Sequence, residues 1–574
     1  MSTPLATLPL LLLDCQSSGA SPRHGALIDL AWCLACGSQR SEITSTLVAL
    51  PESTSLPKRV ELMTGLSAEA LAEAPTAAEV WASLAAQLQS AGPQAVALAH
   101  YSRFEAAWLS DLAARFGDGE FPLPWLCTHE LAKRLVPDLP RRGLRALAGY
   151  LGHPLPAAKR SAEHVEATWQ IWLALLPRLV EIELHTLEDL RVWLAGSKAV
   201  SSGKRDFPFS RERRLSLPKG PGVYKMRDAK GRIVYVGKAT SLRSRVNSYY
   251  RQRKGATKQT FEMLAQVWDI DVEELSSPLE AAMREHDLIK ELEPVYNVAL
   301  RAGGRETFYV SPQLEASSSR DAEHGLGPLT DRGVVELFAQ LRAGAEVQSL
   351  LSEELTLEEE VARDGLTLFL ERHEVSTLSA SEVSRVGRRV RLARAIEEAV
   401  LAAQEAARAE NSQPGMAESR ANPKGCEQEA SDKTADLEAE LEPDLLEAAE
   451  DDEVWDAERV ARLLEGFALR FHQQLRRGRW LRLLVDSHVW WEGEKGAQHE
   501  LEVRGGALRI ENTSLEVEGL SVDDEAFDII TYDRLRVLTT ELKRLHAAGR
   551  PLFVQLSTGV SLVREQLGKL FRTL

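Results

Sequence analysis

The chain has 574 residues, a length that predicts three or four domains of roughly 150 residues each. Hydrophobic residues make up 44% and charged residues 27%, as in ordinary soluble globular proteins. The formal net charge of −16 argues, for the chain as a whole, against a polyanionic partner such as nucleic acid. Five cysteines are too few for a disulfide framework, and the apolar run at residues 8–13 is too short for a membrane helix. We therefore expect a multidomain protein of the cytoplasm.

Residues 1–182 predict an α/β domain with a mixed sheet, because strand-like apolar runs alternate with helical periodicity. The next stretch is polar and rich in Ser, Gly and Lys, so 183–212 is predicted to be a connector. The predicted strands are 9–14, 26–35, 42–50 and 95–99, and the predicted helices are 67–91, 103–116 and 160–180.

Residues 213–310 predict a second, smaller α/β domain. Short strand patterns at 222–227 and 232–237 are joined by Asp228-Ala-Lys-Gly231, which is typical of a turn. Helical patterns follow at 240–251, 256–266 and 278–291. Between 203 and 260 there are 17 Lys and Arg but only three acids, a local charge of +14 that leaves −30 for the remainder. Such a stripe, interleaved with tyrosines, favours contact with a phosphate backbone over a merely solvated surface.

The C-terminal half contains no motif that indicates a catalytic or binding site. Residues 311–408 are rich in Leu, Glu, Ala and Arg and predict a helical region. Residues 409–457 predict an acidic disordered linker, because 436–458 contains 12 acids and no Lys or Arg. Residues 458–574 predict a small α/β domain of unknown role, with a helix from about 460, strands near 480–491 and 499–511, a helix near 532–547 and a final strand and helix.

Tyrosines on neighbouring strands of the second domain point to hydrolysis of a phosphodiester. That reaction needs an activated water, stabilisation of charge on the phosphate, and positioning. A phenol has a pKa near 10, and we expect Lys238, Arg243 and Arg245 to lower that value for the tyrosines beside them. Glu285 stands on an apolar helix pattern, where a single Mg²⁺ or Mn²⁺ is the natural partner for its carboxylate.

These residues occur in an ordered set of motifs: Gly222-Val-Tyr224, Tyr235-Val-Gly237-Lys238, Leu242-Arg-Ser-Arg245, Glu285-His-Asp-Leu-Ile-Lys290 and Pro294-Val-Tyr-Asn297. The set resembles the GIY-YIG nuclease domain of the excinuclease C type, UvrC and its shorter relative Cho. The resemblance implies Tyr235 as general base with support from Tyr224, a metal on Glu285, and phosphate stabilisation by Lys238 and Arg245, with Asn297 bracing the site. Further contacts with DNA are expected from Arg243, Arg251, Arg253, Lys254 and Lys258.

The N-terminal domain is similar to the DEDDh type of 3′–5′ exonuclease, from the motif around Leu10-Leu-Leu-Leu-Asp14 to the one that begins at Lys159. That family needs about four carboxylates for two metals and a His to activate water. Asp14 is in place, but Gln16 stands for a carboxylate, Glu105 for an Asp, Lys159 for the His and His164 for the last Asp. We therefore predict an exonuclease fold with a degenerate, inactive site. The alternative is that Glu163 or Glu166 substitutes through a register shift.

Together these features predict a DNA endonuclease that acts in repair, dependent on Mg²⁺ or Mn²⁺, with DNA as its partner and a damage-recognition or DNA-loading protein as a further one. One alternative is a nuclease selective for flaps or branched DNA outside excision repair. Another is a DNA-binding adaptor in which both nuclease folds are silent. No membrane partner is expected.

Overall fold

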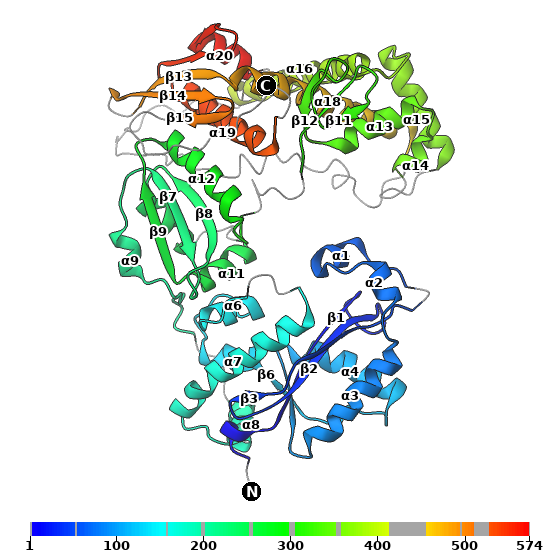
Figure 1. Cartoon of the computed structure of the whole chain (residues 1–574), viewed down its shortest axis with the longest axis vertical. Helices are drawn as coiled ribbons and strands as arrows, with labels where there is room; N and C mark the ends of the chain where they lie inside the picture. Colours follow the sequence, from blue (N-terminus) through cyan, green and yellow to red (C-terminus); the bar gives the residue numbers. More distant parts are fainter. Residues whose placement is uncertain are drawn as a thin grey trace. The chain divides into compact units, whose positions relative to one another are not determined.

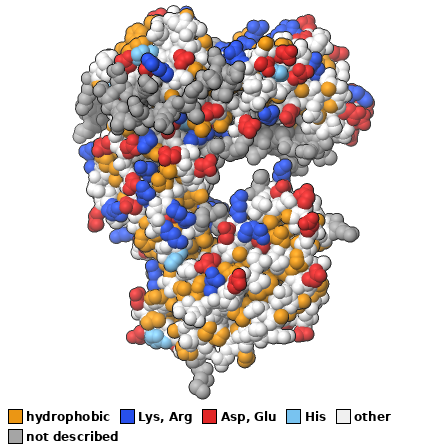
Figure 2. All heavy atoms as spheres, viewed as in Figure 1, with side chains coloured by type: hydrophobic (Ala, Val, Ile, Leu, Met, Phe, Trp, Pro, Cys, Tyr) orange, Lys and Arg blue, Asp and Glu red, His pale blue; other side chains and the backbone are white. Residues whose placement is uncertain are grey.

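The computed structural model describes residues 3–51, 54–155, 159–196, 201–251, 257–297, 305–351, 358–411, 455–493, 496–509 and 527–572. The chain divides into two compact units, Met1–Ser276 with Leu292–Asn297, and Ser277–Glu291 with Val298–Leu574. Figure 2 shows acidic and basic side chains interspersed on one face of the molecule. Within the described ranges, none of the helices combines the length and apolar character needed to cross a membrane.

The first unit begins with a mixed sheet in the order β3-β2-β1-β5-β6, with β4 paired to β2. β1 is antiparallel to β2 and parallel to β5, which is parallel to β6. A mixed α/β fold was predicted here and is confirmed. The strands are β1 (Leu10–Ser17), β2 (Leu27–Cys36), β3 (Gln39–Arg40), β4 (Thr44–Leu47), β5 (Val96–Ala99) and β6 (Trp125–Cys127).

Helices cover both faces of this sheet (Figure 1), and alternation along β1 distributes its leucines between the two layers. Leu10 and Leu12 join the core under α7, whereas Leu11 and Leu13 join the core under α3 and α4. The helices of this layered domain are α1 (Lys58–Thr64), α2 (Ala68–Ala72), α3 (Ala77–Ala91), α4 (Ser102–Phe116), α5 (Thr128–Leu135), α6 (Leu144–Tyr150), α7 (Ser161–Glu181) and α8 (Leu187–Gly196).

One local prediction for this domain was wrong. The helix predicted over 67–91 is two helices, because Pro75 interrupts the first and Thr76 starts the second. Thr76 forms a capping box with Glu79, which satisfies free amide groups at the start of α3. In the stretch 183–212, which was predicted to be a connector, α8 spans Leu187–Gly196 and α9 (Arg211–Ser216) begins near its end.

A three-stranded antiparallel sheet in the order β8-β7-β9 completes the first unit. Its strands are β7 (Gly222–Arg227), β8 (Ile233–Ala239) and β9 (Asp269–Glu274), with helices α10 (Leu242–Tyr250) and α11 (Lys258–Gln266). The β7–β8 turn closes on Asp228, whose Oδ1 accepts from the amides of Lys230 (2.9 Å) and Arg232 (3.0 Å). Sequence analysis missed β9, where acidic residues alternate with Ile270 and Val272.

The small sheet domain packs on the exonuclease-like domain through α6 and α11. The Trp268 indole N–H donates to the carbonyl of Gly149 (2.8 Å), and Arg145 pairs with Glu262 (3.3 Å). A Cβ on Gly149 would lie 2.1 Å from the Gln266 side chain, so the close approach requires glycine. The two domains are therefore held together by a fitted contact within one unit.

The second unit begins with α12 (Pro278–Leu292) and a three-stranded sheet in the order β11-β10-β12. The helical region predicted over 311–408 also contains the short strands β11 and β12, and its described part is helical from Arg332 onward except for the turns between helices. Of the predicted linker 409–457, residues 412–454 lie outside the described residues. The elements are β10 (Phe308–Val310), β11 (Ala316–Ser317), β12 (Leu326–Leu329), α13 (Arg332–Arg342), α14 (Val347–Leu351), α15 (Glu359–His373), α16 (Ala380–Asn411) and α18 (Ala457–Leu484).

A five-stranded antiparallel sheet in the order β15-β14-β13-β16-β17 ends the chain. The strand predicted near 480–491 starts later, because residues up to Leu484 finish the amphipathic α18 and bury Trp480 and Leu481. Leu279 and Met283 of α12 join the core of this sheet with Trp491. The elements are β13 (Ser487–Glu492), β14 (Gln498–Arg504), β15 (Ala507–Arg509), α19 (Ile529–Ala547), β16 (Leu552–Gln555), β17 (Ser561–Val563) and α20 (Arg564–Phe571).

Candidate active site

Tyr224 and Tyr235 lie on one face of the small sheet. In the β7–β8 register Tyr224 is opposite Gly237, and Met226 is opposite Tyr235. Side chains two residues apart share a face, so both phenols project to the same side. The Tyr224 ring covers Gly237, since an added Cβ there would lie 2.3 Å from the Tyr224 hydroxyl oxygen. Glycine at position 237 therefore makes the space in which Tyr224 is buried.

A third tyrosine links these two into a chain of hydroxyl groups. The Tyr249 hydroxyl is 2.8 Å from that of Tyr224, and it donates to the Tyr235 hydroxyl at 3.3 Å. The ring centroids are 6.2 Å apart in every pair. Sequence analysis included Tyr249 only in the basic stripe and assigned it no role in the site. Its spacing of four residues from Arg245, which places both on one face of a helix, was the available signal.

Burial decides the protonation of Tyr224. The side chain is completely buried, and this burial raises its pKa well above the ordinary value, although Arg245 acts in the opposite direction. The expectation that neighbouring cations lower the pKa of this phenol was therefore wrong. Tyr224 is neutral at physiological pH and serves as a hydrogen-bonding group, whereas Tyr235 is half-buried and reaches the surface.

Arg245 projects from α10 onto the tyrosines. Its guanidinium hydrogen bonds with the Tyr224 side chain and lies 5.2 Å from the centroid of the Tyr249 ring. Burial alone would lower the pKa of Arg245, but the neighbouring phenols raise it overall. The group therefore keeps its positive charge inside the site, where a planar guanidinium can bind phosphate oxygens.

Asn297 braces the strand that carries Tyr235. Its side-chain oxygen accepts from the amide of Val236 (2.9 Å), and its side-chain nitrogen donates to the carbonyl of the same residue (2.9 Å). The amide is buried, so both bonds are shielded from water. Because Val236 stands between Tyr235 and Gly237, this pair of bonds fixes the position of the site's strand.

Other predicted residues surround the site at different depths. Lys238 is buried, and strand alternation gives it the face of Val236 and not that of Tyr235, so its contact with phosphate stays a prediction. The Arg243 guanidinium donates to the carbonyl of Leu217 (2.6 Å) and so holds the chain next to α9. Among the remaining expected DNA contacts, Arg251 and Lys258 are exposed, and Arg253 and Lys254 lie outside the described residues.

Glu285 lies on α12, in the second unit, and its side chain is 6% exposed. In the described parts of the chain, no three His, Cys, Asp or Glu side chains gather into a metal cage. Mg²⁺ does not require such a cage, because it keeps several waters and binds through one or two carboxylates and the substrate's phosphates. A single buried carboxylate therefore fits this metal.

In the exonuclease-like site, His164 and Glu105 each lie near Asp14 of β1. The His164 Nδ1 lies 3.1 Å from the Asp14 Oδ2, so this carboxylate oxygen is hydrogen-bonded to an imidazole. Burial and the nearby Asp14 raise the pKa of Glu105 to about 9. Its Oε2 is buried and has no hydrogen-bond partner among the described residues. An imidazole at position 164 and a side-chain amide at position 16 are poor replacements for the anionic ligands of two metal ions.

The remaining polar groups near this site have structural partners. The Gln16 side-chain nitrogen donates to the carbonyl of Lys159 (2.8 Å). Glu163 accepts from the amide of Lys159 (2.6 Å) at the start of α7, and Glu166 pairs with Arg40 (2.5 Å). Glu163 and Glu166, which could have replaced the missing carboxylates, are therefore used in a helix cap and an ion pair.

Residues 220–298 match the family model described as the UvrC-like GIY-YIG domain. The matched stretch contains the tyrosines, Arg245, Glu285 and Asn297. This stretch is a UvrC-like GIY-YIG domain. The resemblance predicted from its motifs is therefore confirmed. A crystal structure of the GIY-YIG N-terminal endonuclease domain of UvrC from Thermotoga maritima, bound to magnesium, is 33% identical and covers 15% of this chain and 94% of that one, with a TM-score of 0.14.

Two curated relatives extend the comparison. The UvrABC system protein C of Chlorobium luteolum is 36% identical over 141 residues, which are 23% of this chain and 22% of the relative. A Mycobacterium tuberculosis protein whose name describes a bifunctional exonuclease/endonuclease is 32% identical over 246 residues, 42% of this chain and 36% of the relative. The N-terminal region of this chain is accordingly exonuclease-like. The chain covers about a fifth to a third of the length of these relatives.

Proposed function

We propose that this protein is a divalent-metal-dependent DNA endonuclease of DNA repair, with an N-terminal exonuclease-like domain that does not cut. The observation that carries the proposal is the hydroxyl chain of Tyr224, Tyr249 and Tyr235 beside the half-buried, charged Arg245. Phenols aligned by hydrogen bonds next to a cation form a site that can take a proton from water and bind the phosphate that the water attacks.

In this mechanism Tyr235 acts as a phenolate, because its half-buried hydroxyl group can release its proton to solvent water. The phenolate oxygen takes one proton from the attacking water, the hydroxide that forms attacks phosphorus, and the bond to the leaving oxygen breaks as that oxygen takes a proton from solvent. The Tyr249 hydroxyl donates a hydrogen bond to the phenolate oxygen and stabilises its charge. Tyr224 stays neutral and orients Tyr249. Arg245 binds the non-bridging oxygens, whose negative charge increases in the transition state. Mg²⁺ held by Glu285, for which Mn²⁺ could substitute, would neutralise charge on the phosphate.

The N-terminal domain is proposed to hold DNA or a partner without degrading it. The support is chemical, because His164 hydrogen bonds with Asp14, and Gln16 and Lys159 stand where the resemblance expects a carboxylate and the catalytic His. An exonuclease assay on a labelled 3′ end with Mg²⁺ or Mn²⁺ tests this point. Degradation that disappears in Asp14→Ala would overturn the assignment.

A panel of DNA substrates tests the proposed endonuclease. The full chain is incubated with Mg²⁺ and an intact duplex, a duplex with one bulky lesion, a flap and a fork, and Tyr235→Phe serves as the inactive match. Incision near the lesion supports the repair role, whereas incision only at the flap or fork supports the structure-selective alternative. If neither protein cuts any substrate, the chain is a DNA-binding adaptor and the proposal fails.

A further inference from the structure

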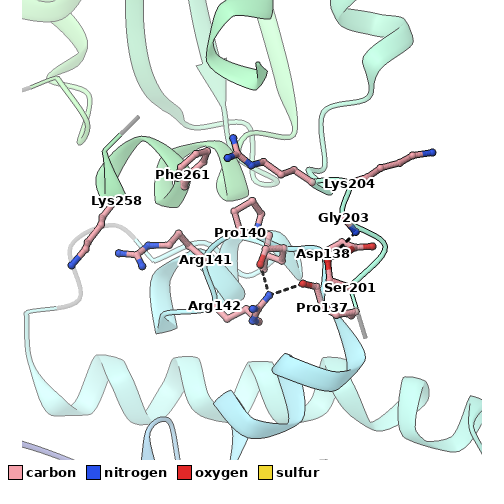
Figure 3. Close-up of a pocket in the computed structure, with 12 residues that line it drawn as sticks. Pro137, Asp138, Pro140, Arg141, Arg142, Ser201, Gly203, Lys204, Lys258 and Phe261 are labelled. Carbon is pink, nitrogen blue, oxygen red and sulfur yellow. Dashed lines mark hydrogen bonds between the residues drawn. The ribbon is translucent and has the colours of Figure 1, made fainter. Parts of the chain in front are cut away.

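A cavity of about 480 Å³ lies in the first unit, apart from both nuclease sites (Figure 3). Three segments surround it: the loop 137–142 after α5, the stretch 201–205 that leads toward α9, and the first turns of α11. Among its described lining residues, none belongs to the tyrosine group or to the Asp14 site. The cavity therefore needs an explanation of its own.

The lining of the cavity is strongly cationic. The lining contains one acidic residue, Asp138, and five basic residues. The basic residues are Arg141, Arg142, Lys204, Arg205 and Lys258. Asp138 accepts hydrogen bonds from the Ser201 hydroxyl (2.6 Å) and the Ser202 amide (2.8 Å), which lower its pKa and fasten the 201–205 stretch to the loop. The hydrogen bonds of Asp138 therefore stabilise the lining of the cavity, and the lining keeps an excess of positive charge.

One of the basic residues, Arg142, stabilises the loop, whereas others can bind a ligand. The Arg142 guanidinium donates to the carbonyls of Val136 (3.3 Å) and Pro137 (3.0 Å), which holds the loop in shape. Arg141, Arg205 and Lys258 have no ion-pair partner in the described parts of the chain. Like charges collected in this way favour an anionic ligand that neutralises them.

An aromatic ring lies among these cations. Phe261 of α11 is half-buried, and the Arg205 guanidinium lies 4.4 Å from the centroid of its ring. Sites for single-stranded nucleic acid combine a basic groove along the backbone with aromatic rings on which bases stack. The volume is in the range of about 300–1,000 Å³ found for ligand sites.

We propose that this cavity binds a single strand of nucleic acid, with its phosphates on Arg141, Arg205 and Lys258 and a base against Phe261. The site joins the exonuclease-like domain to the GIY-YIG domain, since the loop 137–142 belongs to the former and α11 to the latter. It deepens the proposed nuclease function by giving a single-stranded segment a place beside the catalytic domain. Binding at this site does not itself require cleavage.

The test measures binding of the full chain to a fluorescent oligothymidylate of about 12 nucleotides by anisotropy, with EDTA present to prevent cutting. R141A/R205A is compared with R115A/R191A, which removes the same charge from exposed arginines outside the cavity. The control is closely matched, because Arg115 also lies over an aromatic ring, 4.8 Å from the Phe116 centroid. We expect R141A/R205A to raise Kd about tenfold at 0.1 M salt and to reduce the salt slope by about 1.4, or 0.7 per lost phosphate contact.

A second measurement does not depend on any variant. An oligonucleotide carrying 5-iododeoxyuridine is crosslinked by light to the wild-type chain, and the modified peptide is expected to contain Phe261. Equal weakening by the two double variants, or crosslinks only outside 137–142, 201–205 and α11, would overturn the proposal. Because both measurements are made without cleavage, a chain that binds here but cuts nothing would refute the nuclease function and leave this site standing.

Discussion

Asp533→Asn tests whether the C-terminal domain holds the helix that carries Glu285. Asp533 of α19 is completely buried, and its Oδ2 accepts from Lys290 of α12 (2.7 Å) and from Arg305 (2.7 Å). The Lys290 side chain is itself only 6% exposed. An amide of the same shape would leave this ammonium group without its anion, which costs about 3–5 kcal/mol for buried pairs. Glu502→Gln is the matched control, because its pair with Arg504 is exposed and worth about 0–1 kcal/mol.

The expected result is a lower melting temperature for the transition of the second unit. At about 2–4 °C per kcal/mol for a unit of this size, Asp533→Asn lowers the midpoint by roughly 6–20 °C, and Glu502→Gln by less than about 4 °C. Because several domains melt in one scan, hydrogen exchange of the α12 peptide gives the local readout. Equal midpoints and equal α12 exchange in the two variants would refute the reasoning.

Three further predictions concern the sites of the first unit. Gly237→Ala pushes a methyl group into the Tyr224 ring, so we expect a loss of about 1–3 kcal/mol in thermal unfolding and slower incision. Tyr249→Phe breaks the hydroxyl chain, so single-turnover incision slows by about tenfold while anisotropy shows unchanged DNA affinity. Glu105 has a folded-state pKa of about 9, so stability falls by about 1.4 kcal/mol per pH unit as pH rises from 4.5 to 9. Glu105→Gln removes that loss, so melting curves should show the variant more stable than wild type at pH 8.

Each of these predictions has a clear contrary result. Wild-type stability in Gly237→Ala would mean that the Tyr224 ring does not cover that position. Full incision by Tyr249→Phe would remove this hydroxyl from the mechanism. A melting difference between Glu105→Gln and wild type that does not change between pH 5 and pH 8 would show that Glu105 ionises normally.

Regular patterns predicted most of the first unit. The apolar runs before and after residue 20 gave the central strands of the mixed sheet, and the spacing of Tyr224 and Tyr235 placed both on strands joined by a turn. Features that depend on distant contacts leave no local pattern. Asn297 and Val236 are 61 residues apart, so only the family resemblance, and not the local sequence, predicted that Asn297 braces the site. Four of the six residues of strand β9 are acidic, and the strand forms because its whole length pairs with β7.

The protonation states also depended on packing. The sequence places cations near Tyr224 and predicted a lowered pKa. In the structure, residues of both strands and of α10 bury the ring, and this burial raises the pKa of Tyr224 by more than Arg245 lowers it. In the same way, Glu105 reads as an ordinary acid in the sequence. It is held neutral only because α4 places it against Asp14 at the end of β1.

Nicking of supercoiled plasmid by wild type and by Glu285→Gln, with Mg²⁺ and with EDTA, tests the central claim most directly. The account predicts that wild type nicks with Mg²⁺, that EDTA stops it, and that Glu285→Gln does not nick although it binds the plasmid as wild type does. Nicking by Glu285→Gln at the wild-type rate, or by wild type in EDTA, would contradict a metal-dependent endonuclease built on this carboxylate.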